Sequence, residues 1–377
     1  MRVFISAGEV SSDRIGAALL CELRGRHPAV EAFGLGGARL AEAGMERWGS
    51  GDELAVAGLT EALSALPTAT SLAARLALAL ARPGSRPQLA VLIDSPGINL
   101  RLAWLCKRAG VPVLQVVAPQ RWAWLGWRAK TLSKLLDGLA VTLPFEQAWF
   151  RSRGVNATFV GHPLVDQGDV PHTRRPNERP LLGLFPGSRR HEIARHLPLM
   201  REVATTLRGE RALEVRVAVA DEAMARRCAE LAPDLRPATA AEVLTCADVA
   251  LAASGTITLE LALADVPQVV LYRLSALSAA AARLLLSVDR VALPNLLCDR
   301  EVVCELLQDD ATPVALGSGV RRLLDDPAAQ QAQRDAYAEL RATLGPPGFA
   351  RRVADLAEGL LDTGGRSGVS RWWGRRC

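Results

Sequence analysis

The sequence lacks the patterns that mark metal-binding, disulfide-stabilised and several nucleotide-binding classes of protein. Its seven cysteines are scattered, with no CxxC pair and no Cys/His spacing typical of zinc ligands. A disulfide framework is not indicated either, which suits a reducing cytoplasm. Neither the GxxxxGKS/T loop of nucleoside triphosphatases nor the GxGxxG turn of dinucleotide-binding proteins is present. We therefore expect no metal and no cofactor.

Long apolar runs are lacking too. The stretch from Leu59 to Ala81 is rich in Leu and Ala, but Glu61, Pro67 and Arg75 interrupt it. It therefore predicts an amphipathic or core helix pair rather than a membrane span. The opening MRVFISAGE predicts a strand rather than a secretion signal. We expect a soluble, cytoplasmic protein.

The excess of positive charge is small. A net charge of +5 is modest for 377 residues, and several of the basic residues lie near the end, around Trp372 and Trp373. Such a tail suits a membrane surface or nucleic acid, but it is more often a frayed, solvated terminus. No internal repeat is evident.

Tryptophan is concentrated in the first half of the chain. Trp122, Trp124 and Trp127 lie among basic residues in the stretch PQRWAWLGWRAK. Tryptophan beside Arg or Lys is typical of a surface that meets lipid head groups or carbohydrate. A core cluster would explain some of these rings but not the cations between them.

Apolar strands alternate with helices along most of the chain, which predicts parallel sheets covered on both faces. The pattern stops in the polar stretch Asp166–Pro180 and then restarts. We therefore predict an α/β protein of two doubly wound domains in tandem, and 377 residues suffice for two cores. The expected strands are Val3–Ser6, Phe33–Leu35, Leu89–Ile93, Val113–Val117, Leu139–Thr142, Thr158–Val160, Leu181–Phe185, Val215–Val219, Val249–Ala253 and Val269–Tyr272.

We place the first domain at residues 1–165, joined by a C-terminal helix at about 345–362 that crosses back to it. The second domain is expected at residues 166–344, followed by the basic tail at 363–377. Doubly wound domains bind ligands at the carboxyl ends of their strands. The cleft between the two domains is therefore the expected site.

Two turns in the second half suit a phosphate. In the first, an apolar strand runs into Ser254-Gly255-Thr256 at the start of a helix that carries Glu260. Unpaired N–H groups and the positive helix end favour an anion there. The second, Pro186–Arg189, adds a guanidinium suited to a diphosphate. An ordinary βα turn explains either one alone, but two in one domain favour a nucleoside diphosphate.

Polar groups also follow strands in the first half. Asp94 comes directly after LAVLI, where a carboxylate at the rim of the sheet can act as a general base. A turn or helix-capping aspartate is an equally common alternative. The stretch AGEVSSD opens a helix, so Glu9 suits sugar hydroxyls while Ser11, Ser12 and Asp13 suit capping. Later, LPN is expected in a loop and EVVCELLQ in a helix.

Taken in order, these motifs resemble lipid-A-disaccharide synthase, an inverting glycosyltransferase family of the GT-B fold. The resemblance covers residues 2–361 and is specific, because many short motifs recur in the right order. The motifs are AGEVSSD, ELAVAG, IDSPGINL, WAW, LPFE, FVGHPLVD, LFPGSR, ASGTITLE, PQVVLYR, LPNLL and ELLQDD.

The resemblance implies transfer of 2,3-diacylglucosamine from UDP to the 6-hydroxyl of 2,3-diacylglucosamine 1-phosphate. The products are a β-1,6-linked disaccharide 1-phosphate and UDP, and no metal is required. The family likewise implies two Rossmann-like domains that face each other across a cleft. By position in the motifs, Asp94 is the expected general base and Arg189 the expected cation on the diphosphate.

The remaining site residues follow from the same resemblance. The donor-binding set is completed by Gly187, Ser188, Ser254, Gly255, Thr256, Glu260, Asn295, Glu301, Glu305 and Gln308. The acceptor side is expected to include Gly8, Glu9, Ser11, Ser12, Asn99, Trp122 and Trp124.

Three departures from the family pattern fall in the first domain. Ser12 stands where glycine is usual, Gly97 where an acidic residue is usual, and Arg121 is an added cation. The donor-side motifs are nearly intact. We therefore expect UDP-sugar binding to be retained and the acceptor, or its acylation, to be the more variable part.

The alternatives are another GT-B transferase with a different lipid acceptor, a UDP-N-acetylglucosamine epimerase, and a non-catalytic UDP-sugar-binding descendant. The expected partners are UDP-linked acylated glucosamine, a lipid phosphate acceptor, the inner face of the cytoplasmic membrane as a peripheral contact, and a second copy of the chain in a homodimer. Nucleic acid is not an expected partner.

Overall fold

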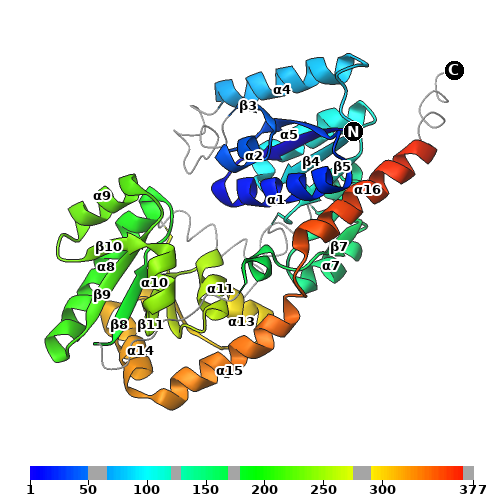
Figure 1. The fold of residues 1–377 in the computed structure, drawn as a ribbon. Coiled ribbons are helices and arrows are strands. Elements are labelled where there is room, and N and C mark those ends of the chain that lie inside the picture. The colour runs from blue at the N-terminus through cyan, green and yellow to red at the C-terminus, as the bar shows by residue number, and fades with distance from the viewer. Residues whose placement is uncertain (50–65, 120–128, 169–178, 275–289, 368–377) are drawn as a thin grey trace. The chain divides into compact units, whose positions relative to one another are not determined.

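The computed structural model describes residues 1–49, 66–119, 129–168, 179–274 and 290–367. The chain divides into two compact units, one of Met1–Asp166 with the chain from Leu344 onward, the other of Gln167–Thr343. Each unit is built on one parallel sheet with helices around it (Figure 1). The predicted α/β fold with two parallel-sheet domains is confirmed.

The first unit has a seven-stranded sheet in the order β3-β2-β1-β4-β5-β6-β7. Its central strands are buried along nearly their whole length, because helices cover both faces. The strands are β1 (Arg2–Ala7), β2 (Glu31–Leu35), β3 (Glu46–Gly49), β4 (Leu89–Ile93), β5 (Val113–Val116), β6 (Gly138–Val141) and β7 (Ala157–Phe159). The helices are α1 (Val10–Arg26), α2 (Ala38–Glu42), α4 (Leu66–Ala81), α5 (Pro96–Arg108), α6 (Ala129–Leu135), α7 (Pro144–Arg151) and α16 (Phe349–Ser367).

The second unit has a six-stranded parallel sheet in the order β10-β9-β8-β11-β12-β13. Its strands are β8 (Leu181–Phe185), β9 (Glu214–Val219), β10 (Arg236–Thr239), β11 (Val249–Ala253), β12 (Gln268–Tyr272) and β13 (Cys304–Leu307). The helices are α8 (Arg190–Glu210), α9 (Glu222–Leu231), α10 (Ala240–Cys246), α11 (Thr256–Leu263), α13 (Leu293–Cys298), α14 (Pro313–Asp325) and α15 (Pro327–Thr343).

Both sheets reverse their strand order once. In the first sheet the reversal lies between β1 and β4, and in the second between β8 and β11. At such a point the loops that follow two neighbouring strands lead away in opposite directions and leave a crevice at the carboxyl edge. The fold therefore creates one favoured ligand position in each unit.

The C-terminal helix α16 belongs to the first unit, where it packs against α1 (Figure 1). Phe349, Val353 and Ala357 of α16 enter the same buried cluster as residues of α1, β1 and β4. No helix in the described part of the chain is both long and apolar enough to cross a bilayer.

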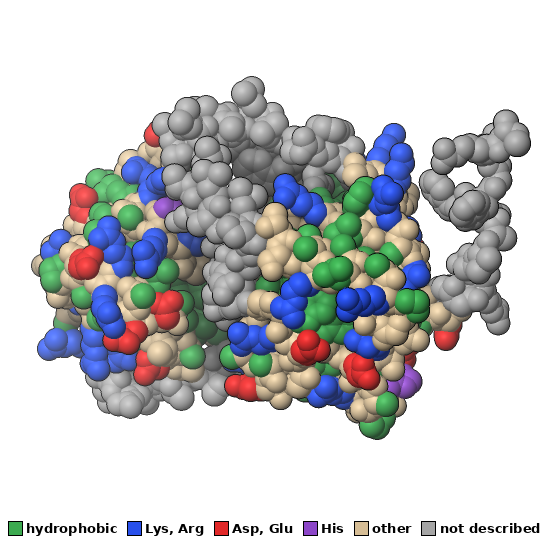
Figure 2. Space-filling view, turned by 90° about the horizontal axis from the view of Figure 1, so that it is seen from above, with side chains coloured by type: hydrophobic (Ala, Val, Ile, Leu, Met, Phe, Trp, Pro, Cys, Tyr) green, Lys and Arg blue, Asp and Glu red, His purple; other side chains and the backbone are tan. Residues whose placement is uncertain are grey.

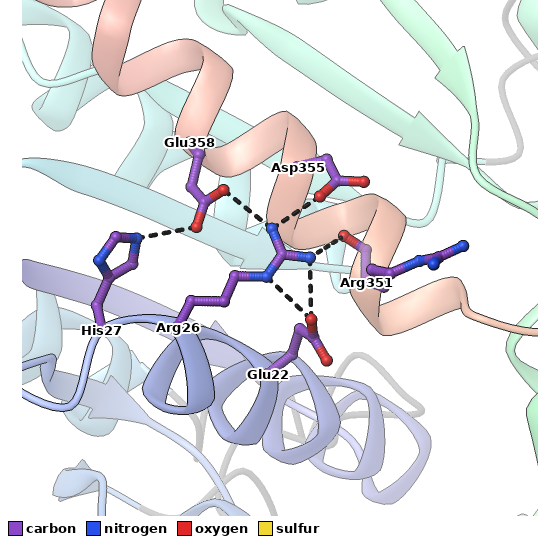
Figure 3. Close-up of polar contacts among 6 residues, drawn as sticks. All are labelled: Glu22, Arg26, His27, Arg351, Asp355 and Glu358. Atoms are coloured by element: carbon purple, nitrogen blue, oxygen red, sulfur yellow. Dashed lines mark hydrogen bonds and ion pairs between the residues drawn. The ribbon is translucent and has the colours of Figure 1, made fainter.

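A charged cluster joins α1 to α16 at the surface (Figure 3). The Arg26 guanidinium donates to Asp355 (2.7 Å), Glu358 (2.9 Å) and Glu22 (2.9 Å). Hydrogen bonds to Asp355 and Glu22 raise the pKa of Arg26 above its usual value, so the side chain stays cationic. His27 contacts the other Glu358 oxygen at 3.0 Å. This cluster adds polar contacts to the apolar packing between the two helices.

The chain segments at the border of the first unit are tied together by hydrogen bonds. The His162 backbone N–H donates to the Leu344 carbonyl (3.0 Å), and Asp166 accepts the N–H groups of Gly348 (2.6 Å) and Phe349 (2.9 Å). The His162 ring is buried, and its Nδ1 accepts the Leu164 N–H (3.3 Å). Burial, with a smaller contribution from the Arg14 charge, lowers the pKa of His162 to about 4.

His162 should make stability fall on mild acidification. Folded His162 stays neutral down to about pH 4, whereas an unfolded histidine titrates near 6.5. Its contribution is therefore complete above pH 6.5 and declines as pH falls to 4, by roughly 3 kcal/mol in total. We expect urea unfolding at pH 7 and pH 4.5 to show a larger loss for the wild type than for His162→Gln. Equal losses would contradict this.

Candidate functional site

The two predicted phosphate turns of the second unit lie beside each other. β8 and β11 are neighbouring parallel strands in which Phe185 pairs with Ala252. The turns that follow them, Pro186–Arg189 and Ser254–Thr256, therefore emerge together at the carboxyl edge of the sheet. This is the point where the strand order reverses.

The Pro186–Arg189 turn is stabilised by its own acidic residue. The Glu192 carboxylate accepts the backbone N–H groups of Ser188 (3.1 Å) and Arg189 (3.2 Å) and also contacts the Arg189 guanidinium (3.3 Å). Gly187 has φ of 109°, and a Cβ there would lie 2.5 Å from Glu192 Oε2. Because these two N–H groups are already paired, the turn offers an anion the exposed Arg189 side chain instead.

The Ser254–Thr256 turn is differently arranged. Ser254 donates its hydroxyl to the Val291 carbonyl (2.9 Å), so that hydroxyl is engaged within the protein. Gly255 and Thr256 are exposed at the start of α11. No acceptor among the described residues receives the backbone N–H of Gly255, Thr256 or Ile257. Three such groups at a helix N-terminus suit a phosphate.

Asn295 and Glu305 hold the chain beside this turn. The Glu305 carboxylate accepts the N–H groups of Val291 (2.7 Å) and Ala292 (3.1 Å), and Asn295 donates to Glu305 (3.0 Å). Ser254 contacts the same Val291 residue. The fold thus brings three sequence-predicted residues together, with much of their hydrogen bonding directed to the backbone. Asn295 itself is 2% exposed.

The local structure around Asn295 and Glu305 differs from the expectation. Asn295 lies in helix α13 rather than in a loop, and Glu305 lies in strand β13 rather than in a helix. The stretch CELL pairs with β12 and forms the edge strand of the sheet. This tertiary pairing outweighs the helix predicted from its local sequence. A strand places Glu305 and Leu307 on one face and Cys304 and Leu306 on the other.

The other predicted donor residues lie around this edge. Gln308 follows β13 and accepts the Leu274 N–H (3.2 Å), while its carbonyl accepts from Arg273 (2.9 Å). Glu260 is half-buried on α11, and Glu301 is exposed before β13.

The sequence argument missed His196, which connects two parts of this edge. His196 is buried on α8, contacts the Pro186 carbonyl with Nδ1 (2.9 Å), and accepts the Arg273 N–H with Nε2 (3.2 Å). A proton on Nδ1 satisfies both of these partners, and burial lowers the pKa of His196. The sequence signal that could have revealed its burial is its spacing from Ile193, Leu197 and Met200, which places it on the apolar face of α8.

In the first unit, the loops after β1 and β4 also meet where the strand order reverses. A Cβ on Gly8 would lie 2.8 Å from Ser95 Oγ, so the two loops are in contact. Glu9 is half-buried at the N-cap of α1, and Ser11 is exposed. Ser12 is 1% exposed, and its hydroxyl has no hydrogen-bond partner among the described residues.

Asp13 does not cap its own helix as expected. Its carboxylate accepts the N–H groups of Gly37 (2.6 Å), Arg39 (2.9 Å) and Leu40 (3.2 Å), and so caps α2. The N-cap of α1 is Glu9. Asp13 therefore joins two helices beside the Gly8 loop.

Asp94 is half-buried at the end of β4, where the sequence places it. Its backbone N–H donates to Val116 (2.9 Å), and its carbonyl accepts from Asn99 (2.7 Å) and Gln115 (3.1 Å). Asn99 is fully buried and also accepts the Ser6 hydroxyl (2.7 Å). Asn99 is thus engaged in holding the Asp94 loop.

Two predicted acceptor-side residues, Trp122 and Trp124, lie outside the described residues, as do Arg121, residues 59–65, most of the expected linker and the end of the basic tail. Within the described ranges, no cluster of His, Cys, Asp and Glu side chains could hold a metal ion.

Comparison with known proteins identifies the chain's relatives. A family model described as lipid-A-disaccharide synthetase matches residues 3–348. The lipid-A-disaccharide synthase of Anaeromyxobacter dehalogenans (strain 2CP-C) is 40% identical over 375 residues, which cover 96% of this chain and 97% of that protein.

Solved structures show the same fold at low sequence identity. The glycosyltransferase of kitacinnamycin matches with a TM-score of 0.63 and 18% identity, covering 96% of this chain and 98% of that one. The UDP-GlcNAc 2-epimerase from Neisseria meningitidis, bound to UDP-GlcNAc, matches with a TM-score of 0.62 and 12% identity, covering 96% and 100%. A transferase and an epimerase match about equally, so the similarity to these structures shows the fold and not the activity.

Proposed function

This chain belongs to the lipid-A-disaccharide synthase family and is a glycosyltransferase, and we propose how its residues carry out the transfer. The donor is UDP-2,3-diacylglucosamine, and the acceptor is the 6-hydroxyl of 2,3-diacylglucosamine 1-phosphate. The acceptor oxygen bonds to the anomeric carbon while the bond from that carbon to the UDP oxygen breaks. The products are the β-1,6-linked disaccharide 1-phosphate and UDP.

The observation that carries the donor assignment is the pair of turns at the β8/β11 edge. Thr256 and its neighbours offer N–H groups without acceptors among the described residues, and Arg189 is an exposed guanidinium beside them. Both kinds of donor suit a diphosphate, because each of its two phosphates is charged and accepts hydrogen bonds. These groups would also stabilise the charge that builds on the leaving UDP.

Replacing Arg189 should weaken UDP binding. A hydrogen bond to a charged group contributes about 1.5–3 kcal/mol, so we expect Arg189→Ala to raise the Kd for UDP by roughly ten- to a hundredfold. Isothermal titration with UDP measures this. Arg226→Ala, which removes an exposed ion pair with Glu222 in the same unit, is the matched control and should bind as the wild type does. An unchanged Kd for Arg189→Ala would contradict the donor assignment.

Asp94 is the base in this proposal. It takes the proton of the acceptor hydroxyl as that oxygen attacks, which leaves the oxygen nucleophilic. Two features support this role, namely its place at the carboxyl end of β4 and the anchoring of its backbone by Asn99 and Gln115. Its half-buried position shields the carboxylate in part from water.

Removal of the Asp94 carboxylate should stop turnover without affecting the donor. We expect Asp94→Ala to lower kcat by about a hundredfold or more while the Kd for UDP stays within twofold. Incubation with both acylated sugars, followed by mass spectrometry of the lipids, measures the product. Rapid disaccharide formation by Asp94→Ala would remove Asp94 from this role.

A different lipid acceptor is the second candidate, and the first-unit departures favour it. Ser12 is buried, and no described residue pairs with its hydroxyl. Gly97 is exposed, and no described atom would lie within 4 Å of a Cβ there, where the family has a carboxylate. The same incubation with acceptors of different acylation distinguishes the two. Conversion of labelled UDP-sugar with no new disaccharide would instead indicate an epimerase.

We also place the protein at the inner face of the cytoplasmic membrane as a peripheral enzyme, because both substrates carry acyl chains. The packed helices α4 and α5 expose Leu78 (58%) and Trp104 (49%). Arg108 lies over the Trp104 ring at 4.7 Å, an apolar and cationic pairing suited to anionic head groups. Figure 2 shows one face of the molecule, on which basic and acidic side chains are interspersed.

Membrane binding should depend on these two side chains. We expect the variant Leu78→Ser/Trp104→Ala to sediment with phosphatidylglycerol–phosphatidylcholine vesicles several-fold less than the wild type. Val314→Ser removes a more exposed apolar side chain, at 83%, from the second unit and should bind as the wild type does. Equal sedimentation of all three proteins would place the membrane contact elsewhere.

A further inference from the structure

The backbone around Asp94 is held in an unfavourable conformation. Asp94, Ser95 and Val117 have φ values of 50°, 42° and 65°, in the left-handed region that non-glycine residues rarely adopt. The three residues lie together, because β4 and β5 are paired with Ile93 opposite Val116. Val117 is β-branched, which makes its conformation the least favourable of the three. Each such residue costs about 1–3 kcal/mol and needs surrounding structure to maintain it.

One buried side chain contacts both strained strand ends. Gln115 is 2% exposed on β5, and its Nε2 donates to the carbonyls of Asp94 (3.1 Å) and Val117 (3.2 Å). The Val116 carbonyl lies 3.4 Å from the same nitrogen. Carbonyl oxygens only accept hydrogen bonds, so the part of the Gln115 amide that faces them must be its NH₂ group. Gln115 therefore connects the residue after β4 to the residue after β5.

A second buried amide contacts the same oxygen of Asp94. Asn99 on α5 donates to the Asp94 carbonyl (2.7 Å) and to the Ile93 carbonyl (3.1 Å). The Ser6 hydroxyl donates to Asn99 Oδ1 and so fixes the orientation of that amide. The Asp94 carbonyl is thereby held from two sides, by a strand and by a helix. The backbone from which the Asp94 side chain extends is restrained with it.

We propose that Gln115 is a positioning residue of the transfer reaction. Its amide keeps the Asp94–Ser95 and Val117 backbones in their left-handed conformation, and this directs the Asp94 carboxylate toward the acceptor hydroxyl. The inference rests on the proposed role of Asp94 as the base. Without the amide, the strained backbone relaxes toward extended conformations and the carboxylate moves. A displacement of about 1 Å can lower a rate a hundredfold.

The test uses the full-length protein and compares kcat with KM. We expect Gln115→Met, which keeps the length of the side chain without its donors, to lower kcat by about ten- to a hundredfold. The KM values for both substrates and the Kd for UDP stay within about twofold. If Gln115→Met does not fold, Gln115→Asn, whose amide is one methylene too short to reach both strand ends, replaces it. Gln147→Leu is the matched control. Gln147 accepts the Phe159 backbone N–H of the same sheet (2.7 Å), away from Asp94, so this variant should leave kcat unchanged.

A double substitution separates positioning from general destabilisation. If Gln115 acts through Asp94, adding Gln115→Met to Asp94→Ala lowers the residual rate no further. Additive losses, or a wild-type kcat for folded Gln115→Met, overturn the positioning role while leaving the proposed function intact. A wild-type rate for Asp94→Ala alone instead overturns the proposed role of Asp94 as the base, and the positioning role with it.

Discussion

The parallel direction of the strands is the constraint on which both candidate sites depend. All described strands in both sheets run in one direction within their sheet. Every loop that follows a strand therefore emerges at the same edge. Where the strand order reverses, the loops after two neighbouring strands lead away in opposite directions. In this way residues far apart in the chain, such as Gly8 and Ser95, come into contact.

Both units hold their loops by the same physical means. Buried or half-buried polar side chains bond to backbone groups that the sheet leaves unpaired. Gln115 and Asn99 do so in the first unit, and Glu305 and His196 do so in the second. An unpaired buried polar group is costly, so such a bond holds its loop strongly. The exposed groups, Arg189 and the start of α11, then remain available to a ligand.

The strands that the sequence failed to predict share one property. β3, β10 and β13 are all edge strands, and none of their residues is fully buried. They have no continuous apolar run, because only one side of an edge strand pairs and its faces are less covered. The buried central strands were predicted within one or two residues, since burial on both faces requires such runs.

Within the site, the sequence predicted residue types and positions better than roles. Asn295, Glu305 and Ser254 were expected to meet the donor. The fold directs Ser254 and Glu305 largely to the backbone of Val291 and Ala292, and Asn295 to Glu305 and the backbone of Val302 and Val303. Gln115 and His196 were missed, because a polar residue within an apolar stretch does not reveal its partner. Asp13 suited a cap, but which helix it caps depends on the packing of α1 against α2.

The sequence by itself determined the family, the two parallel-sheet domains and the strand ends at which the candidate site residues lie. Periodicity and short motifs are local properties, and a chain can be searched for them without coordinates. Only the tertiary structure decided which polar groups are used internally and which face solvent. Hydrogen-bond partners such as Gln115 and Asp94, or Ser254 and Val291, lie far apart in the chain, and only folding brings them within bonding distance.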